Sequence, residues 1–227
     1  MSDVYRMVDD IKPDLRKRAG YDLAVSSMNI VLQPGDRLYR QIISDKEKAL
    51  GIRKSYFRTK VEQLINDPEI AAGVYLPENK AVYINSDLSQ FACYGTIIHE
   101  LVHLGQDEKY PTVVRLSQNS QPGLNKKDRL LMHAFLEADA YDIMEQLLRS
   151  RGFNPADFYN ELLELAPLNI MREIRNIFRR KDPVEKYTAN WQRKNLSLAD
   201  KVVVLQNPAK IAKFYDSHDK PDAVLAA

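Results

Sequence analysis

The spacing of hydrophobic and polar positions predicts a mostly helical chain with one small region of β-structure. Residues 45–66 carry apolar side chains at helical spacing among many charges, which predicts an amphipathic helix that ends before Pro68. The helical pattern returns at about residues 94–106 and again at about residues 127–151, where Gly152 provides a C-terminal stop. Three long helices are therefore expected.

Two short β-prone runs, residues 73–76 and 81–85, are separated by residues 77–80, whose Pro-Glu-Asn-Lys composition is typical of a hairpin turn. This hairpin is the one clear sheet signal. Residues 109–125 hold two prolines and a glycine and are predicted to form a loop. The pattern as a whole predicts an α+β fold with a small antiparallel sheet or hairpin.

The length of 227 residues suits one sizeable core with an extension. We predict one domain at residues 1–152, with its core at about residues 45–152. Residues 153–227 are expected to be a helical extension, because prolines cut a largely helical pattern into short pieces, and its tail at residues 216–227 is expected to fray.

Composition narrows the possible partners and location. Hydrophobic residues make up 44% and charged residues 28%, the balance of an ordinary globular protein, and no apolar run approaches the ~20 residues of a membrane-spanning helix. Residues 1–20 lack the apolar stretch of a secretory signal, and Cys93 is the one cysteine, so no internal disulfide can form. The net charge of +2 does not favour a nucleic-acid partner. We expect a cytoplasmic protein that binds no membrane.

The strongest local motif is H-E-x-x-H at residues 99–103. On a helix, His99 and His103 fall about 40° apart and one turn up, so both imidazoles can reach one metal ion. Glu100 lies about 60° from His103, beside the metal face, where it can act on a water molecule. A chance match in a chain of this length is on the order of 1 in 100. The opposite arc is apolar and is expected to pack in the core, and it holds Ile97, Ile98, Leu101, Val102 and Leu104.

A catalytic zinc usually takes three protein ligands, so a third is needed. Glu137 lies in the middle of the apolar stripe of the later helix, where an unpaired carboxylate would be costly. Zinc ligation would remove that cost, and so would a buried salt bridge. His133 lies one turn earlier on nearly the same face. It is open whether His133 replaces Glu137 as a ligand, supports a ligand, donates to the transition state or is a core histidine bonded to backbone.

Three acidic residues near these positions are not expected to be zinc ligands. Asp107 lies one turn past His103 and could orient its ring. Asp139 and Asp142 point away from the apolar stripe and are expected to be solvated.

His99-Glu100-x-x-His103 followed by Glu137-Ala138-Asp139-Ala140 resembles the zincin metallopeptidases, and specifically the gluzincins. The resemblance implies a zincin-like fold, one zinc ion per chain and a glutamate on a second helix as third ligand. The metzincin pattern is excluded, because positions 106 and 109 hold glutamine and lysine instead of glycine and histidine. The aspartate that some gluzincins have four residues after the glutamate is here Tyr141.

The resemblance also extends to the hairpin, because zincins place an edge strand beside the active-site helix to pair with extended substrate. The strand formed by Val82, Tyr83, Ile84 and Asn85 is therefore expected to bind a peptide or protein substrate by strand pairing.

The resulting hypothesis is a zinc metallopeptidase in which Glu100 is the general base and His133 or Tyr141 donates to the oxyanion. Three alternatives stay open. One is a zinc amidase that acts on a non-peptide substrate. Another is a non-catalytic regulatory or binding module with a vestigial zinc site, against which the presence of Glu100 counts. The last is nucleic-acid binding by the basic residues at 167–183, whose plainer interpretation is a solvated helix face.

Overall fold

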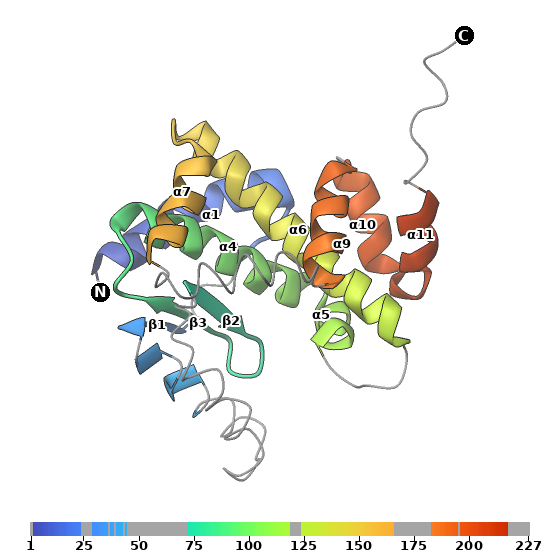
Figure 1. Ribbon diagram of the computed structural model, residues 1–227, viewed down its shortest axis with the longest axis horizontal. Helices are drawn as coiled ribbons and strands as arrows, with labels where there is room; N and C mark the ends of the chain where they lie inside the picture. Colours follow the sequence, from blue (N-terminus) through green and yellow to red (C-terminus); the bar gives the residue numbers. More distant parts are fainter. Residues whose placement is uncertain are drawn as a thin grey trace. The chain divides into compact units, whose positions relative to one another are not determined.

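The computed structural model describes most of the chain, coloured by sequence in Figure 1. The described residues are 2–23, 29–35, 37–38, 40–42, 44, 72–118, 124–165, 183–194 and 196–217. The predicted helix at residues 45–66 lies outside them, as do nearly all of the basic segment at 167–183 and most of the predicted tail at 216–227.

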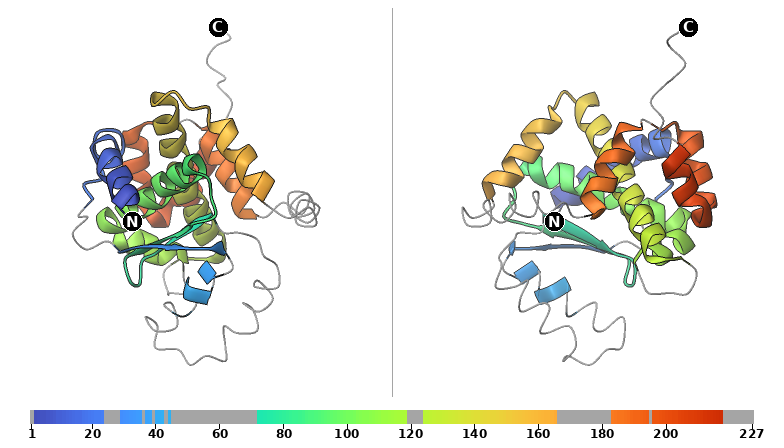
Figure 2. Two further views of the ribbon diagram at one scale, coloured as in Figure 1. Left: turned by 90° about the vertical axis from the view of Figure 1, so that its left-hand side faces the viewer. Right: turned by 45° about the vertical axis from the view of Figure 1, so that its right-hand side comes forward.

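A three-stranded sheet is built from β1 (Asn29–Gln33), β2 (Gly73–Leu76) and β3 (Ala81–Asn85). β3 lies in the middle, parallel to β1 and antiparallel to β2 (Figures 1 and 2). The β2–β3 hairpin has the predicted bounds, and its turn includes Lys80 at a φ of 49°. The predicted antiparallel hairpin is present, and β1 adds a parallel strand that makes the sheet mixed. β1 was not foreseen, because its short apolar run becomes a strand through pairing with residues about 50 positions away.

The remaining regular structure is helical, which confirms the α+β class. The helices are α1 (Ser2–Ala19), α4 (Gln90–Lys109), α5 (Pro111–Gln118), α6 (Lys126–Ser150), α7 (Pro155–Leu165), α9 (Pro183–Arg193), α10 (Leu198–Gln206) and α11 (Ile211–Ser217), with a 3-10 turn, η2, at Pro208–Lys210. None of the described helices combines the length and apolarity needed to cross a bilayer.

Three of these helices bear on the sequence predictions. α4 and α6 occupy the two predicted helical segments around the motif and around Glu137, with α4 extending further at both ends. α5 lies inside residues 109–125, so the prediction of a continuous loop there is wrong. The prediction treated Pro111 as a helix breaker. A proline at the first position of a helix loses no hydrogen bond, however, and Pro111 begins α5.

Contacts group the chain into two compact units. Unit 1 comprises Met1–Gly105 and Ile143–Arg179, and unit 2 comprises Gln106–Asp142 and Arg180–Ala227. This grouping differs from the predicted division at residue 152, because α7 belongs to unit 1 while α9, α10 and α11 belong to unit 2. The division into a domain and an extension stays a prediction.

In unit 1, glycines bring α4 close to its neighbours. A Cβ atom on Gly73 of β2 would lie 2.6 Å from Cγ2 of Thr96 on α4. A Cβ atom on Gly95 would lie 2.5 Å from Cδ2 of Phe158 on α7. Real Cβ atoms do not approach other heavy atoms this closely, so both contacts depend on glycine. The motif helix is thereby seated against the sheet on one side and α7 on another.

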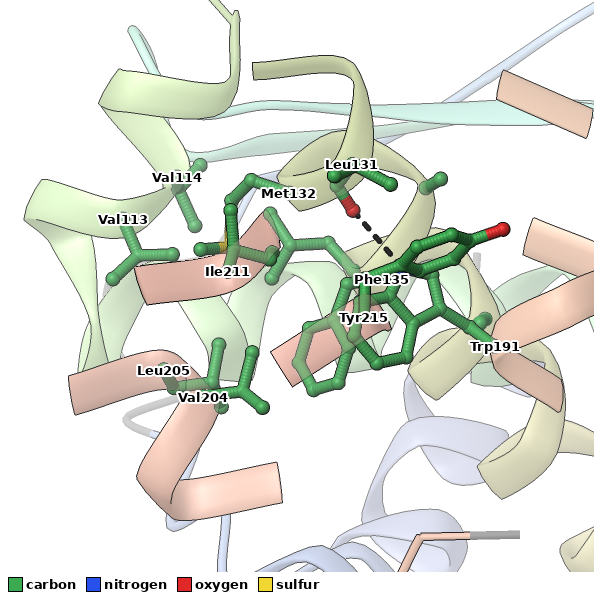
Figure 3. Packing of buried hydrophobic residues seen from close by; sticks show 13 residues of the cluster. Val113, Val114, Leu131, Met132, Phe135, Trp191, Val204, Leu205, Ile211 and Tyr215 are labelled. Atoms are coloured by element: carbon green, nitrogen blue, oxygen red, sulfur yellow. Dashed lines mark hydrogen bonds between the residues drawn. The ribbon is translucent and has the colours of Figure 1, made fainter. Parts of the chain in front are cut away.

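Unit 2 is organised around an aromatic cluster (Figure 3). The indole Nε1 of Trp191 on α9 donates a hydrogen bond to the carbonyl of Leu131 on α6 at 3.2 Å. The Trp191 ring also contacts the rings of Phe135 and Tyr215, each at a centroid distance of 5.1 Å. The first half of α6 is thus packed against helices from the C-terminal part of the chain.

Candidate metal centre

Helix α4 carries the H-E-x-x-H motif. At its N-terminus, the Oγ of Ser89 accepts a hydrogen bond from the backbone N–H of Ala92 at 3.1 Å, which satisfies one of the donors that a helix start leaves free. The predicted apolar arc is at most 1% exposed, which confirms the amphipathic interpretation of this helix, and its residues are Ile97, Ile98, Leu101, Val102 and Leu104.

The two histidines of the motif face each other. The Nε2 atoms of His99 and His103 lie 3.1 Å apart, and the ring centroids are 4.7 Å apart at an interplanar angle of 82°. Both side chains are half-buried. One turn of helix has therefore brought two nitrogen donors to a common point, as the spacing predicts.

This separation fits a shared zinc ion. Two nitrogens bound to a tetrahedral zinc at about 2.0–2.1 Å lie roughly 3.3–3.4 Å apart. The 3.1 Å between the Nε2 atoms differs from this by only a few tenths of an ångström. A hydrogen bond between the rings gives a similar distance if one Nε2 carries a proton, so the histidine pair needs a third donor to make a metal site.

That third donor is supplied by α6. One ligand atom from each of His99, His103 and Glu137 lies within 4.8 Å of the others. Among the described residues, this is the one cluster of three or more histidine, cysteine or acidic side chains that could hold a metal ion. Glu137 is half-buried. A zinc site needs this carboxylate oxygen at roughly 3.3 Å from each nitrogen, which lies within the 4.8 Å limit and which side-chain torsions can adjust.

The proposed base, Glu100, is buried, with 6% of its surface exposed. It follows His99 directly and so belongs to the same turn of α4. Glu100 is the one carboxylate among the buried residues of α4, whose other buried polar side chains, Thr96 and Gln106, are uncharged. Its role as a general base stays a prediction.

Three further predicted site residues are half-buried and do not belong to the group of three ligands. Asp107 lies on α4, and His133 and Tyr141 lie on α6. Their proposed roles, orienting a ligand or donating to an oxyanion, stay predictions.

The structure corrects the prediction that β3 binds substrate. β3 pairs with β1 on one side and with β2 on the other, so both of its backbone edges are already used. Val82, Tyr83, Ile84 and Asn85 are all buried, at 1% exposure or less. The prediction that they pair with an extended peptide is wrong, because it took the hairpin for the whole sheet and did not foresee the parallel partner β1.

The structure also corrects the prediction that Asp139 is solvated. It is 4% exposed instead of solvated, and its carboxylate accepts hydrogen bonds from Nε2 of Gln106 at 3.0 Å and from Nζ of Lys201 at 2.9 Å. Lys201 also reaches the half-buried Asp142 at 3.3 Å, so Asp142 is not simply solvated either. The helical wheel of α6 could not show these partners, since Lys201 lies 62 residues further along the chain.

No family model, no curated protein and no solved structure matches this chain. What the chain does has to be inferred from its own residues. Two neutral imidazoles and one carboxylate form a donor set typical of catalytic zinc, and they leave a bound divalent cation with a net positive charge that favours a developing anionic oxygen.

Proposed function

We propose that this chain is a zinc-dependent hydrolase, and specifically a gluzincin-like metallopeptidase with a zincin-like active-site region. The observation that carries the proposal is the convergence of His99, His103 and Glu137, with ligand atoms within 4.8 Å of one another, on an H-E-x-x-H helix. A structural metal site does not need a buried glutamate beside its ligands, and Glu100 supplies one.

Each residue type suits its proposed role. His99 and His103 offer neutral Nε2 donors, and Glu137 offers one negative charge. Zinc, when bound, lowers the pKa of water and polarises a carbonyl group. Glu100 takes a proton from the attacking water and passes it to the leaving amine, which is general acid–base chemistry. His133 and Tyr141 are proposed as donors to the oxyanion, and Asp107 as the residue that orients the His103 ring.

A zinc amidase with a non-peptide substrate is the second candidate. The hairpin was the reason for preferring a peptide, and the central position of β3 removes that reason. The H-E-x-x-H helix supports water activation whichever acyl group is cleaved. We propose a cytoplasmic location for either enzyme, since Cys93 is the single cysteine of the chain.

The two candidates are separated by mass spectrometry of peptide termini. A cell extract is incubated with the wild-type protein, and a second portion is incubated with Glu100→Gln, which is expected to keep the fold and the metal. New peptide termini with the wild type alone support the peptidase. A wild type that binds zinc and produces no termini beyond those of Glu100→Gln contradicts the peptidase and favours the amidase.

A further inference from the structure

A chain of buried polar contacts runs through unit 2 next to Glu137. Gln106 is fully buried, and its Nε2 donates both to the carbonyl of Leu136 at 3.0 Å and to Oδ2 of Asp139 at 3.0 Å. The other oxygen of Asp139 accepts from Nζ of Lys201 at 2.9 Å. Four residues from α4, α6 and α10 are thus linked by direct hydrogen bonds.

The position of these contacts relates them to the metal centre. Gln106 lies three residues past His103 on α4, and its two acceptors lie on either side of Glu137 in the sequence of α6. A helix that slid or rotated by one residue would lose both acceptors of Gln106 at once. Within unit 2, the side chain therefore fixes the last turn of α4 against the part of α6 that carries the proposed third ligand.

Lys201 completes the arrangement from α10. Its side chain is 13% exposed and forms ion pairs with Asp139 and Asp142. Burial alone would lower the pKa of Lys201, but the charges and hydrogen bonds of the two aspartates outweigh burial and raise it, so the amine stays protonated. The start of α10 is itself held by a reciprocal cap between Ser197 and Asp200.

We propose that Gln106, Asp139 and Lys201 are positioning residues for the metal centre, and that α10 is therefore needed for full metal affinity. This inference rests on the proposed zinc site. The three residues are not among the proposed ligands. They hold the backbone on either side of Glu137, as outer partners hold the ligands in other metal sites, where their loss weakens metal binding by about 10- to 100-fold.

The decisive variant is the double substitution Asp139→Asn with Lys201→Met, which removes both charges of the buried pair and costs the half-buried Asp142 one contact. Zinc affinity is measured by competition with a chelator, and the geometry of the site by the visible absorption spectrum of bound Co²⁺. We expect at least about tenfold weaker zinc binding and an altered Co²⁺ spectrum, with an unchanged circular dichroism spectrum. The single variant Lys201→Arg keeps the positive charge and should bind zinc with wild-type affinity.

Arg149→Met is the matched control. It breaks an exposed ion pair with Glu145 at 2.7 Å on the same helix, away from Glu137, and should leave zinc affinity unchanged. If the double variant does not fold, Gln106→Met decides by the same measurements, because it leaves the Asp139–Lys201 pair intact. A folded variant with wild-type affinity and Co²⁺ spectrum overturns the positioning role alone. A wild type that binds no zinc overturns this role together with the proposed function.

Discussion

The Nε2 atoms of His99 and His103 lie 3.1 Å apart on successive turns of α4. Two imidazole nitrogens this close either share a proton or share a cation, because two lone pairs or two N–H groups facing each other would repel. We propose a shared cation, because Glu137 brings a carboxylate, a further metal-ligand type, to the same point. The predictions below test this interpretation and the packing that supports it.

Glu100→Gln should keep the metal and lose hydrolysis. The amide cannot accept the proton of the attacking water, so we expect the turnover of a cleaved substrate to fall by about 10²-fold or more, equivalent to ~2.7 kcal/mol of transition-state stabilisation. Glu108→Gln changes a glutamate of the same helix outside the motif and should behave like the wild type. Equal turnover of the wild type and Glu100→Gln would rule out Glu100 as the base.

Glu137→Ala should weaken zinc binding sharply, while His133→Ala should retain it. Alanine favours the helix and buries no charge, so both variants are expected to fold. Zinc affinity by chelator competition gives the comparison. The reverse result, with zinc lost in His133→Ala and kept in Glu137→Ala, would make the site a three-histidine one and contradict the gluzincin-like assignment while leaving a zinc hydrolase possible.

Gly95→Ala should destabilise the protein, although alanine in a helix interior is normally better than glycine by about 1 kcal/mol. The new Cβ would lie 2.5 Å from the Phe158 ring, and overpacking of this kind typically costs 1–3 kcal/mol. The free energy of unfolding in urea measures the effect. Adding Phe158→Leu should recover part of the loss. A Gly95→Ala protein more stable than the wild type would show that α4 and α7 do not approach as described.

Tyr94→Phe should be as stable as the wild type at pH 7, or more stable by about 1 kcal/mol, because the Tyr94 hydroxyl is buried with no hydrogen-bond partner in the described part of the chain. Its ring stays available to the Arg151 guanidinium, 5.5 Å from the ring centroid. A loss of more than about 1 kcal/mol at pH 7 would indicate a bonded hydroxyl.

The same substitution should reduce the sensitivity of the protein to alkaline pH. Burial raises the pKa of Tyr94 to about 12, despite the opposing charge of Arg151. The unfolded chain, with an ordinary tyrosine pKa of about 10, loses this proton first, so ionisation of Tyr94 favours the unfolded state and stability falls as pH rises from about 10 to about 12. Urea unfolding at pH 7 and pH 11 should show a smaller difference for Tyr94→Phe than for the wild type.

The sequence was informative where the signal is local. The H-E-x-x-H spacing and the apolar arc opposite it lie within three turns of one helix, and the β2–β3 hairpin lies within 13 residues, so periodicity and turn composition were enough to predict α4 and both strands. α5 shows the limit of local rules, since Pro111 can either break a helix or begin one.

Long-range pairing explains the failures. β1 pairs Asn29 with Ala81, and this partner made β3 a central strand instead of a substrate-binding edge. Asp139 was expected in solvent because the wheel of α6 shows only its own residues, whereas Gln106 and Lys201 come from other helices. Tertiary contacts of this kind leave no periodic trace in the sequence.

Zinc content of the purified protein tests the central claim most directly. After mild dialysis, elemental analysis of the wild type should find about one zinc ion per chain, and His99→Ala, which removes one ligand, should retain almost none. Zinc far below one per chain that added Zn²⁺ cannot restore, or the same zinc content in the wild type and in His99→Ala, would contradict a zinc site at His99, His103 and Glu137.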